Sequence, residues 1–262
     1  MTSMDPQMKE QALRYMNLLN KNVRNQDPTT IGILVAVFVV FLTIVFLAFR
    51  RKSNKRSGVL LLGTCESGKT LLFNRLVYQR YNDTFTSISS NSGDYQVQGK
   101  NKRLRVIDVP GHERLRQTML EQNKGLARAI VYVVDSSTVQ KEIKDVADYL
   151  YTVLSDSVIS YNAPPVLVAC NKQDMLTSKG AQLIRSQLEK EMNTLRVTRS
   201  ASLKQIESSG NNNTFLGKRD KDFSFDHMKP IKIDFVECSL KGKTADSEPV
   251  MKDLQEWLLK IA

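Results

Sequence analysis

The chain has 262 residues, of which 41% are hydrophobic and 25% are charged. This composition excludes a wholly disordered chain, and the length suits one large domain with an appendage or two small domains. The formal net charge of +11 would suggest a nucleic-acid-binding protein, but residues 50–56 alone contribute +5. Because the basic excess is concentrated beside an apolar segment, we predict no direct nucleic-acid binding.

That apolar segment runs from Ile31 to Phe49, nineteen residues without a charged side chain. As a helix it would span about 28 Å, close to the hydrocarbon core of a bilayer at about 30 Å. A buried core helix would show a polar stripe, and a signal peptide would be followed by small residues rather than by basic ones. We predict a single-pass transmembrane helix over 31–49.

The flanking charges predict the orientation of this helix. Basic residues follow it in the linker 50–56, whereas the nearest charge before it is Asp27. Because basic flanks stay on the cytoplasmic side, residues 57–262 should form a cytosolic domain, and the short segment 1–30 should lie in the lumen.

The first motif of this domain is a glycine-rich loop between the apolar run 59–62 and the helix-like run 71–78. It reads G-x-x-x-x-G-K-[ST], and a strand that turns into a helix leaves backbone N–H groups free to cradle phosphates. Lys69 should reach the β and γ phosphates as a catalytic residue, and the Thr70 hydroxyl should ligate Mg²⁺. The predicted nucleotide-binding residues here are Gly63, Thr64, Cys65, Glu66, Ser67, Gly68, Lys69, Thr70 and Leu71.

A D-x-x-G motif, Asp108 to Gly111, follows the apolar run 104–107. Alone it would usually be a surface turn, but here it follows a strand and lies downstream of a phosphate loop. Asp108 is the predicted second protein contact for the magnesium ion, directly or through water, and the Gly111 N–H should meet the γ phosphate.

An N-K-x-D motif, Asn171 to Asp174, follows the apolar run 166–170. A carboxylate at Asp174 can accept hydrogen bonds from the ring N–H and the amine of guanine, and adenine has no matching donor pair. Asn171 can tie this loop to the phosphate loop, and the stem of Lys172 can cover the ring. The motif therefore favours GTP over ATP.

Short apolar runs alternate with amphipathic stretches from residue 57 onward. This rhythm predicts an α/β fold with a mostly parallel buried sheet and helices on both faces. The candidate strands are 58–62, 104–107, 129–134, 166–170 and 231–236; the candidate helices are 70–79, 139–154, 181–195 and a last one through Val250 and Ile261. Residues 196–230 break the rhythm, and we expect a long, partly disordered surface insertion there. The three cysteines Cys65, Cys170 and Cys238 should be reduced and packed.

The last strand ends in Glu237 to Lys241, whose backbone, at Ser239 and Leu240, could close over the guanine from the other side. With four motifs in this order, residues 57–262 resemble the Ras-like small GTPases, the P-loop GTPases with GTP/GDP and Mg²⁺ as ligands. Leu240 replaces the alanine of the S-A-K pattern of that family.

Within these GTPases the chain is most similar to the family of signal recognition particle receptor beta subunits. The resemblance rests on the predicted membrane anchor and on three stretches, Asp-Val-Pro-Gly-His-Glu (108–113), Ala-Cys-Asn-Lys-Gln-Asp (169–174) and Leu-Arg-Val-Thr-Arg-Ser (195–200). It implies a protein of the endoplasmic reticulum membrane whose GTP-bound form holds the receptor alpha subunit in a heterodimer. The ribosome and the translocon remain open as further partners.

The resemblance also implies roles for individual residues. Thr84, Phe85, Thr86 and Ser87 match the first nucleotide-sensing loop of the GTPases, with Thr86 as a further magnesium ligand. His112 takes the place of the glutamine that positions the attacking water, so intrinsic GTP hydrolysis should be slow, on the order of 10⁻⁴ to 10⁻³ per second or less. Arg114 and Arg116 are expected to be solvated helix residues rather than arginine fingers.

Two functional classes remain open at this point. The domain is either a switch enzyme that cycles between GTP and GDP, or a binding module whose GTP-ordered loops hold a partner while hydrolysis is rare. An Arf-like trafficking GTPase is a third alternative, but its reversible anchor would conflict with a permanent membrane span.

Overall fold

The computed structural model describes residues 32, 35–36, 38–46, 56–85, 87–97, 102–205, 215–241 and 248–262, with only the backbone of 200–205. The chain divides into two units, Met1–Lys55 and Arg56–Ala262. In the first unit residues 38–46 are helical. The predicted span 31–49 lies partly outside the described residues, and segments 1–30 and 50–55 lie wholly outside them. Within the described part of the chain, no helix is both long and apolar enough to cross a bilayer.

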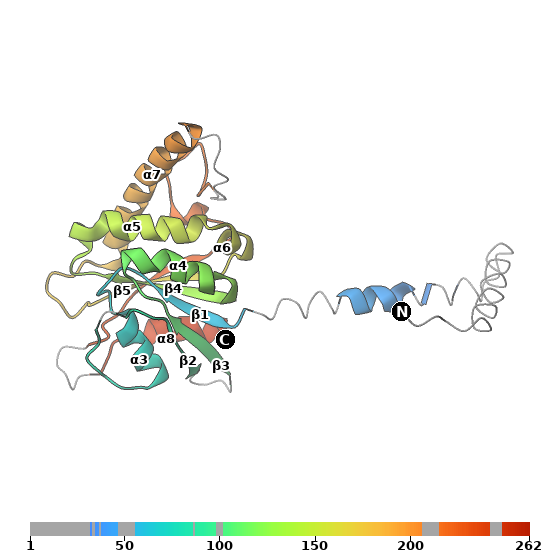
Figure 1. Cartoon of the computed structure of the whole chain (residues 1–262), viewed down its shortest axis with the longest axis horizontal. Helices are drawn as coiled ribbons and strands as arrows, with labels where there is room; N and C mark the ends of the chain where they lie inside the picture. The colour runs from blue at the N-terminus through green and yellow to red at the C-terminus, as the bar shows by residue number, and fades with distance from the viewer. Residues whose placement is uncertain are drawn as a thin grey trace. The chain divides into compact units, whose positions relative to one another are not determined.

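The second unit is built on one six-stranded sheet (Figure 1). Its strands are β1 (Gly58–Leu62), β2 (Asn91–Gln96), β3 (Arg103–Asp108), β4 (Ala127–Asp135), β5 (Val166–Asn171) and β6 (Ile233–Glu237). Their order in the sheet is β2-β3-β1-β4-β5-β6, and every neighbouring pair is parallel except β2 with β3. The carboxyl ends of the five parallel strands therefore meet at one edge of the sheet, where such folds bind their ligands.

Helices cover both faces of this sheet (Figure 1). They are α3 (Lys69–Val77), α4 (Glu113–Asn123), α5 (Val139–Ser155), α6 (Ser157–Asn162), α7 (Ala181–Gln205) and α8 (Lys252–Ile261), with two 3₁₀ turns, η2 (Lys124–Leu126) and η3 (Phe225–His227). α4, α5, α6 and α7 pack on one face, while α3 and α8 pack on the other.

The two faces have separate hydrophobic cores, and β4 contributes to both. Ile130 and Tyr132 point into the core beneath α4 to α7, whereas Val131 and Val133 point into the core beneath α3 and α8. Because successive side chains of a strand alternate between faces, a strand covered on both sides must be apolar at nearly every position. The uninterrupted apolar runs follow from this arrangement, and the predicted α/β fold is confirmed.

The apolar pattern did not predict β2, α4 or the short α6, although Arg114 and Arg116 of α4 were expected to be helix residues, and β2 and α4 show the reason. β2 is a polar edge strand, and Tyr95 is its one buried side chain. α4 buries only Arg116 and Leu120. Neither β2 nor α4 has the regularly spaced apolar residues from which the other strands and helices were predicted.

The expected surface insertion at 196–230 is wrong for the parts that the structure describes. α7 continues as a helix through Gln205, and the side chains of Phe223, Phe225 and Met228 are buried in the core. Arg196 fastens this segment, because its guanidinium donates to the carbonyl oxygens of Lys218 at 2.8 Å and Lys221 at 2.7 Å. Residues 206–214 lie outside the described residues.

Candidate functional site

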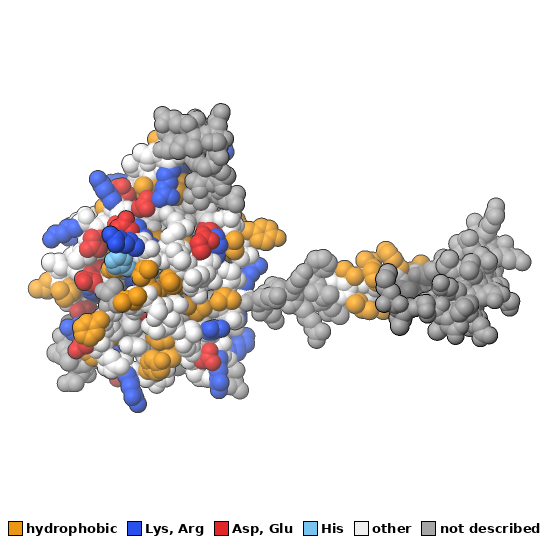
Figure 2. Space-filling model, viewed as in Figure 1, with side chains coloured by type: hydrophobic (Ala, Val, Ile, Leu, Met, Phe, Trp, Pro, Cys, Tyr) orange, Lys and Arg blue, Asp and Glu red, His pale blue; other side chains and the backbone are white. Residues whose placement is uncertain are grey.

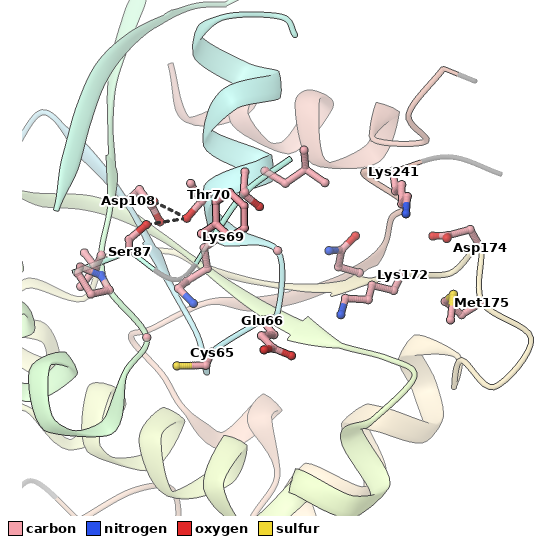
Figure 3. Close-up of a pocket in the computed structure, with 18 residues that line it drawn as sticks. Cys65, Glu66, Lys69, Thr70, Ser87, Asp108, Lys172, Asp174, Met175 and Lys241 are labelled. Atoms are coloured by element: carbon pink, nitrogen blue, oxygen red, sulfur yellow. Dashed lines mark hydrogen bonds between the residues drawn. The ribbon is translucent and has the colours of Figure 1, made fainter. Parts of the chain in front are cut away.

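A cavity of about 490 Å³ opens at the carboxyl edge of the sheet (Figure 3). Its walls come from the loops that follow β1, α3, β3, β5 and β6. The lining residues are Cys65, Glu66, Gly68, Lys69, Thr70, Leu71, Thr84, Phe85, Ser87, Asp108, Val109, Pro110, Gly111, Asn171, Lys172, Asp174, Met175 and Lys241. The structure thus brings together residues from four separate sequence motifs.

The glycine-rich loop joins β1 to α3 and depends on two glycines. The backbone φ angles of Gly63 and Gly68 are 142° and 99°, a region that residues with a β carbon rarely adopt. A β carbon on Gly63 would collide with the Val133 carbonyl oxygen, and one on Gly68 would collide with Asn171. The loop therefore passes close to its neighbours and presents the N-terminus of α3, with its free N–H groups, to the cavity.

Lys69 is the buried cation of this loop. Its ammonium donates to the Thr64 carbonyl oxygen at 2.6 Å, and the residue is 6% exposed. Burial lowers the pKa of Lys69, while the nearby charges of Asp108 and Cys65 oppose that shift. A positive charge with few neutralising partners at the cavity wall suits the binding of an anion.

Three oxygen-bearing side chains meet beside Lys69 (Figure 3). The Thr70 hydroxyl donates to Asp108 Oδ2 at 2.8 Å and lies 3.1 Å from the Ser87 hydroxyl. Asp108 is fully buried, and its Oδ1 finds no hydrogen-bond partner among the described residues.

Burial raises the pKa of Asp108, although the Thr70 hydroxyl and the Lys69 charge pull it down. A buried carboxylate with an unpaired oxygen beside two hydroxyl groups fits a hard cation such as Mg²⁺, which prefers oxygen ligands. Thr86, the further predicted magnesium ligand, lies outside the described residues.

The loop after β3 brings Gly111 against the phosphate loop. A β carbon on Gly111 would lie 2.5 Å from Lys69 Nζ and 2.6 Å from the Gly63 carbonyl oxygen, so only glycine fits. His112 does not line the cavity. It is exposed and caps α4, with its Nδ1 accepting from the Arg114 N–H at 3.3 Å.

Asn171 connects the loop after β5 to the phosphate loop, as its motif predicts, and also to the loop after β6. Its side-chain amide donates to the Ser67 carbonyl oxygen at 2.8 Å and accepts from the Leu240 N–H at 3.2 Å. Asn171 is 2% exposed, so these bonds are shielded from water. One side chain therefore fixes the spacing between the Lys69 end and the Asp174 end of the cavity.

Two further contacts orient the side chains at the Asp174 end of the cavity. The Ser239 hydroxyl donates to Asp174 Oδ1 at 2.6 Å, which holds the carboxylate in place. Lys172 forms an ion pair with Asp135 Oδ2 at 2.6 Å. Burial alone would raise the pKa of Asp135, but bonds from Lys172 and Ser137 outweigh it and hold that pKa below its ordinary value.

Not every predicted residue reaches the cavity wall. Gly63, Thr64, Ser67, Ser239 and Leu240 do not line the cavity, whereas Asn171 both lines it and binds the backbone of Ser67 and Leu240. The predicted set lacked Val109 and Pro110, which lie inside the D-x-x-G motif, and three residues outside the predicted positions: Asp135, Met175 and Lys241. Lys241 could have been found as the lysine of the S-A-K pattern, but the other two follow from contacts that the sequence does not display.

The cysteines are free, as predicted. Cys170 and Cys238 are buried, and burial raises the pKa of the Cys238 thiol to about 12. Cys65 differs, because it is partly exposed at the cavity wall.

Sequence comparisons place these features in a known family. The family model described as "Signal recognition particle receptor beta subunit" matches residues 54–231. The receptor beta subunit of Rattus norvegicus is 49% identical over 252 residues, which cover 95% of this chain and 93% of that protein. The beta subunit of Saccharomyces cerevisiae is 27% identical over 188 residues, covering 67% and 75% of the two chains.

Solved structures agree with the sequence comparisons. A chain of "The Structure of the Mammalian SRP Receptor" is 48% identical and superposes with a TM-score of 0.68, covering 78% of this chain and all of that one. "Signal recognition particle receptor SRb-GDP-Mg from Chaetomium thermophilum" is 25% identical with a TM-score of 0.58, covering 78% and 97%. This chain therefore belongs to the family of signal recognition particle receptor beta subunits.

Proposed function

We propose that this chain is a GTPase of the endoplasmic reticulum membrane that binds GTP and GDP with Mg²⁺, and whose GTP-bound form holds the receptor alpha subunit for protein targeting. One observation carries the nucleotide part of this proposal. The Asn171 side chain joins the phosphate loop to the base loop, with Lys69 and Thr70 at one end of the cavity and Asp174 at the other. This spacing suits a guanine nucleotide.

Each end of the cavity has a defined task in this proposal. Lys69 and the N–H groups at the start of α3 hold the phosphates, while Asp174 accepts hydrogen bonds from the guanine. Thr70 and Asp108 hold the magnesium ion, which when bound neutralises charge on the phosphate oxygens. Family membership and a relative described with GDP and Mg support these assignments.

Slow hydrolysis is part of the same proposal. His112 Nδ1 is engaged in capping α4, so only Nε2 remains to orient a water molecule. We infer that the loop must rearrange before His112 acts, and that GTP persists long enough to hold a partner.

The membrane part of the proposal rests on the apolar run 31–49, on the basic linker 50–56 and on the family. We propose that 31–49 spans the membrane once, with 57–262 in the cytosol. The alpha subunit is the expected partner, because the family consists of beta subunits of a receptor. Contacts with the ribosome and the translocon are further proposals from the same resemblance.

The test is the nucleotide that stays bound to the full chain, purified in mild detergent without added nucleotide, then extracted and separated by chromatography. Retained guanine nucleotide supports the proposed site: GTP indicates a slow GTP-dependent tether, and GDP indicates unaided hydrolysis. Retained adenine nucleotide, or a chain that binds neither GTP nor GDP when these are added, would refute it.

A further inference from the structure

The edge of the sheet opposite the nucleotide cavity carries a cluster of basic side chains. We call this cluster the basic end; its members are Arg56, Lys102, Arg103, Arg128 and Lys260. All five belong to the amino ends of β1, β3 and β4 or to the last turn of α8. Figure 2 shows Lys and Arg side chains along the edge of the domain at which β1 begins.

Strand register and contacts show that these residues share one end of the domain. Gly58, the first residue of β1, pairs with Arg105 on one side and with Ala127 on the other. The Arg128 guanidinium donates to the Ile261 carbonyl oxygen at 2.6 Å, and the Lys102 ammonium donates to Ala262 O at 2.6 Å. The ends of β3, β4 and α8 therefore meet.

The positive charge of the basic end is largely unneutralised. Among the described residues, none of its five members forms an ion pair with an aspartate or a glutamate. Nearby Lys124 differs, because Asp156 at 2.7 Å and Glu121 at 2.6 Å offset its charge. Asp253 and Glu256 line a groove with Lys260 and partly offset its charge, but no described aspartate or glutamate pairs with Arg56, Lys102, Arg103 or Arg128, so this end attracts anions.

An exposed aromatic side chain lies beside these charges. Tyr161, in the last turn of α6, is 89% exposed. Its neighbour Asn162 accepts a hydrogen bond from the Arg56 guanidinium at 2.9 Å. Tyrosine next to basic residues is the combination that membrane–water interfaces favour, because the ring suits the boundary and the hydroxyl stays hydrated.

Chain length limits how far this end can lie from a bilayer. Seven residues, 50–56, separate the apolar run from the start of the domain, and fully extended they reach about 25 Å. The cytoplasmic leaflet is anionic, and its field extends over a Debye length of about 8 Å at physiological salt. A tether of this length keeps the end that carries Arg56 within reach of the membrane surface.

We propose that the basic end and Tyr161 dock on the anionic lipid headgroups of the membrane, so that the nucleotide cavity faces away from the bilayer. The inference rests on the proposed membrane anchor. Docking would limit rotation of the domain and keep its nucleotide-sensing loops open to a partner from the cytosol.

The test uses tryptophan fluorescence of the full chain in vesicles. Tyr161→Trp places a reporter at the basic end, and Leu176→Trp places one at a fully exposed site beside Asp174, as a matched control. Trp257 is buried, and its signal is recorded in the chain without an added Trp and subtracted, for each charge variant separately. The vesicles are phosphatidylcholine, with or without phosphatidylserine, and carry lipids brominated near the headgroup.

Docking predicts that the bromolipids quench Trp at 161 but not at 176, only in vesicles with phosphatidylserine, and that salt reverses the effect. Arg103→Glu with Lys260→Glu should lower the ratio of docked to undocked domain by at least about tenfold. Lys141→Glu with Lys144→Glu makes the same charge change at the start of α5 and should leave the ratio of docked to undocked domain unchanged. Any of three results would overturn the proposal: no quenching of Trp at 161, equal quenching in vesicles without phosphatidylserine, or an equal loss of quenching in both charge variants.

The same vesicles separate this inference from the anchor on which it rests. A chain that alkaline carbonate extracts, but whose Trp at 161 was quenched beforehand, would refute the anchor and support docking. A chain that resists extraction without any quenching at 161 would refute docking and support the anchor. Nucleotide content, measured in parallel, tests the nucleotide site independently.

Discussion

At the scale of single residues, we predict that base preference depends on the Asp174 carboxylate. The Ser239 hydroxyl holds one of its oxygens at 2.6 Å. Asp174→Asn should lower GTP affinity by about a hundredfold, because an amide donor would then face the donors of guanine. The same change should raise affinity for XTP, since xanthine offers an acceptor there. Competition against a fluorescent guanine nucleotide measures both effects.

Asp253→Asn serves as the control for this change. Asp253 is an exposed carboxylate in the first turn of α8, and it does not line the cavity. This variant should bind GTP like the parent chain. An unchanged preference for GTP over XTP in Asp174→Asn would contradict the role given to this carboxylate.

Asp135 should make the stability of the domain depend on pH. Its folded pKa lies below the ordinary value of 3.8, because Lys172 and Ser137 outweigh the effect of burial. The ionised carboxylate therefore stabilises the fold above that value, and the contribution is lost as the pH falls through the folded pKa. Asp135→Asn should cost about 1–3 kcal/mol at neutral pH.

The measurement is urea unfolding of both chains across a pH series. The difference in unfolding free energy between the parent chain and Asp135→Asn should be constant near neutral pH and shrink below about pH 4. A difference that grows on acidification would show that the ion pair with Lys172 does not stabilise the fold. GTP affinity should fall as well, since Lys172 loses the partner that positions it.

At the scale of elements, α4 is held by a buried arginine. The Arg116 guanidinium pairs with Asp145 at 2.8 Å and lies 4.7 Å from the centre of the Tyr149 ring. The expectation that Arg116 is solvated is wrong, because the residue is only 8% exposed. A long side chain can bury its stem and its planar head together when a carboxylate and an aromatic ring meet the guanidinium.

Arg116→Ala should lower the unfolding free energy by about 1–3 kcal/mol, through the lost ion pair and the lost contact with the ring. Arg114→Ala, two positions earlier on the same helix, is the control. Arg114 is exposed, so its replacement should change stability by less than about 0.5 kcal/mol. Equal effects of the two changes in urea titrations would show that Arg116 does not anchor α4.

The elements differ in how readily the sequence predicts them. β1 is a run of buried residues, and its predicted bounds match the structure, because a strand covered on both faces needs apolar side chains throughout. β2 and α4 escaped prediction because long-range contacts stabilise them: β2 pairs with β3, and Arg116 attaches α4 to α5. Such contacts leave no local period in the sequence.

The candidate site was more predictable than these two elements. A loop that wraps phosphates needs its glycines and a lysine such as Lys69 at set positions. A guanine-binding loop likewise needs residues such as Asn171 and Asp174 at a set spacing, so both loops appear in the sequence as motifs. Asp135 supports Lys172 from the end of β4, which only the fold brings alongside β5. His112 was predicted as a group facing the nucleotide, but its place at the start of α4 turns Nδ1 toward the backbone.

At the scale of the molecule, the two proposals assign different tasks to the two ends of the parallel sheet. The carboxyl ends hold the loops that Asn171 joins into one cavity. The amino ends carry the basic end, where Arg128 and Lys102 also fasten the last turn of α8. Because β1 runs parallel to its neighbours, the chain enters the sheet at the end away from the cavity, and the proposed N-terminal anchor would leave the nucleotide loops accessible.

This arrangement predicts that the domain folds without the N-terminal unit. It also predicts that Arg56 is part of the domain. The fragment Arg56–Ala262 should be soluble, unfold cooperatively in urea and bind GTP as tightly as the full chain, since its cores and cavity use no residue before Arg56 among those described. A fragment that starts at Ser57 lacks the bond from Arg56 to the Asn162 carbonyl oxygen and should be less stable by about 0.5–1.5 kcal/mol. Arg56→Lys in the longer fragment is the control, because it keeps the charge but not the guanidinium geometry. Aggregation of both fragments would contradict the boundary at Arg56, whereas equal stability of the two would place the boundary after it.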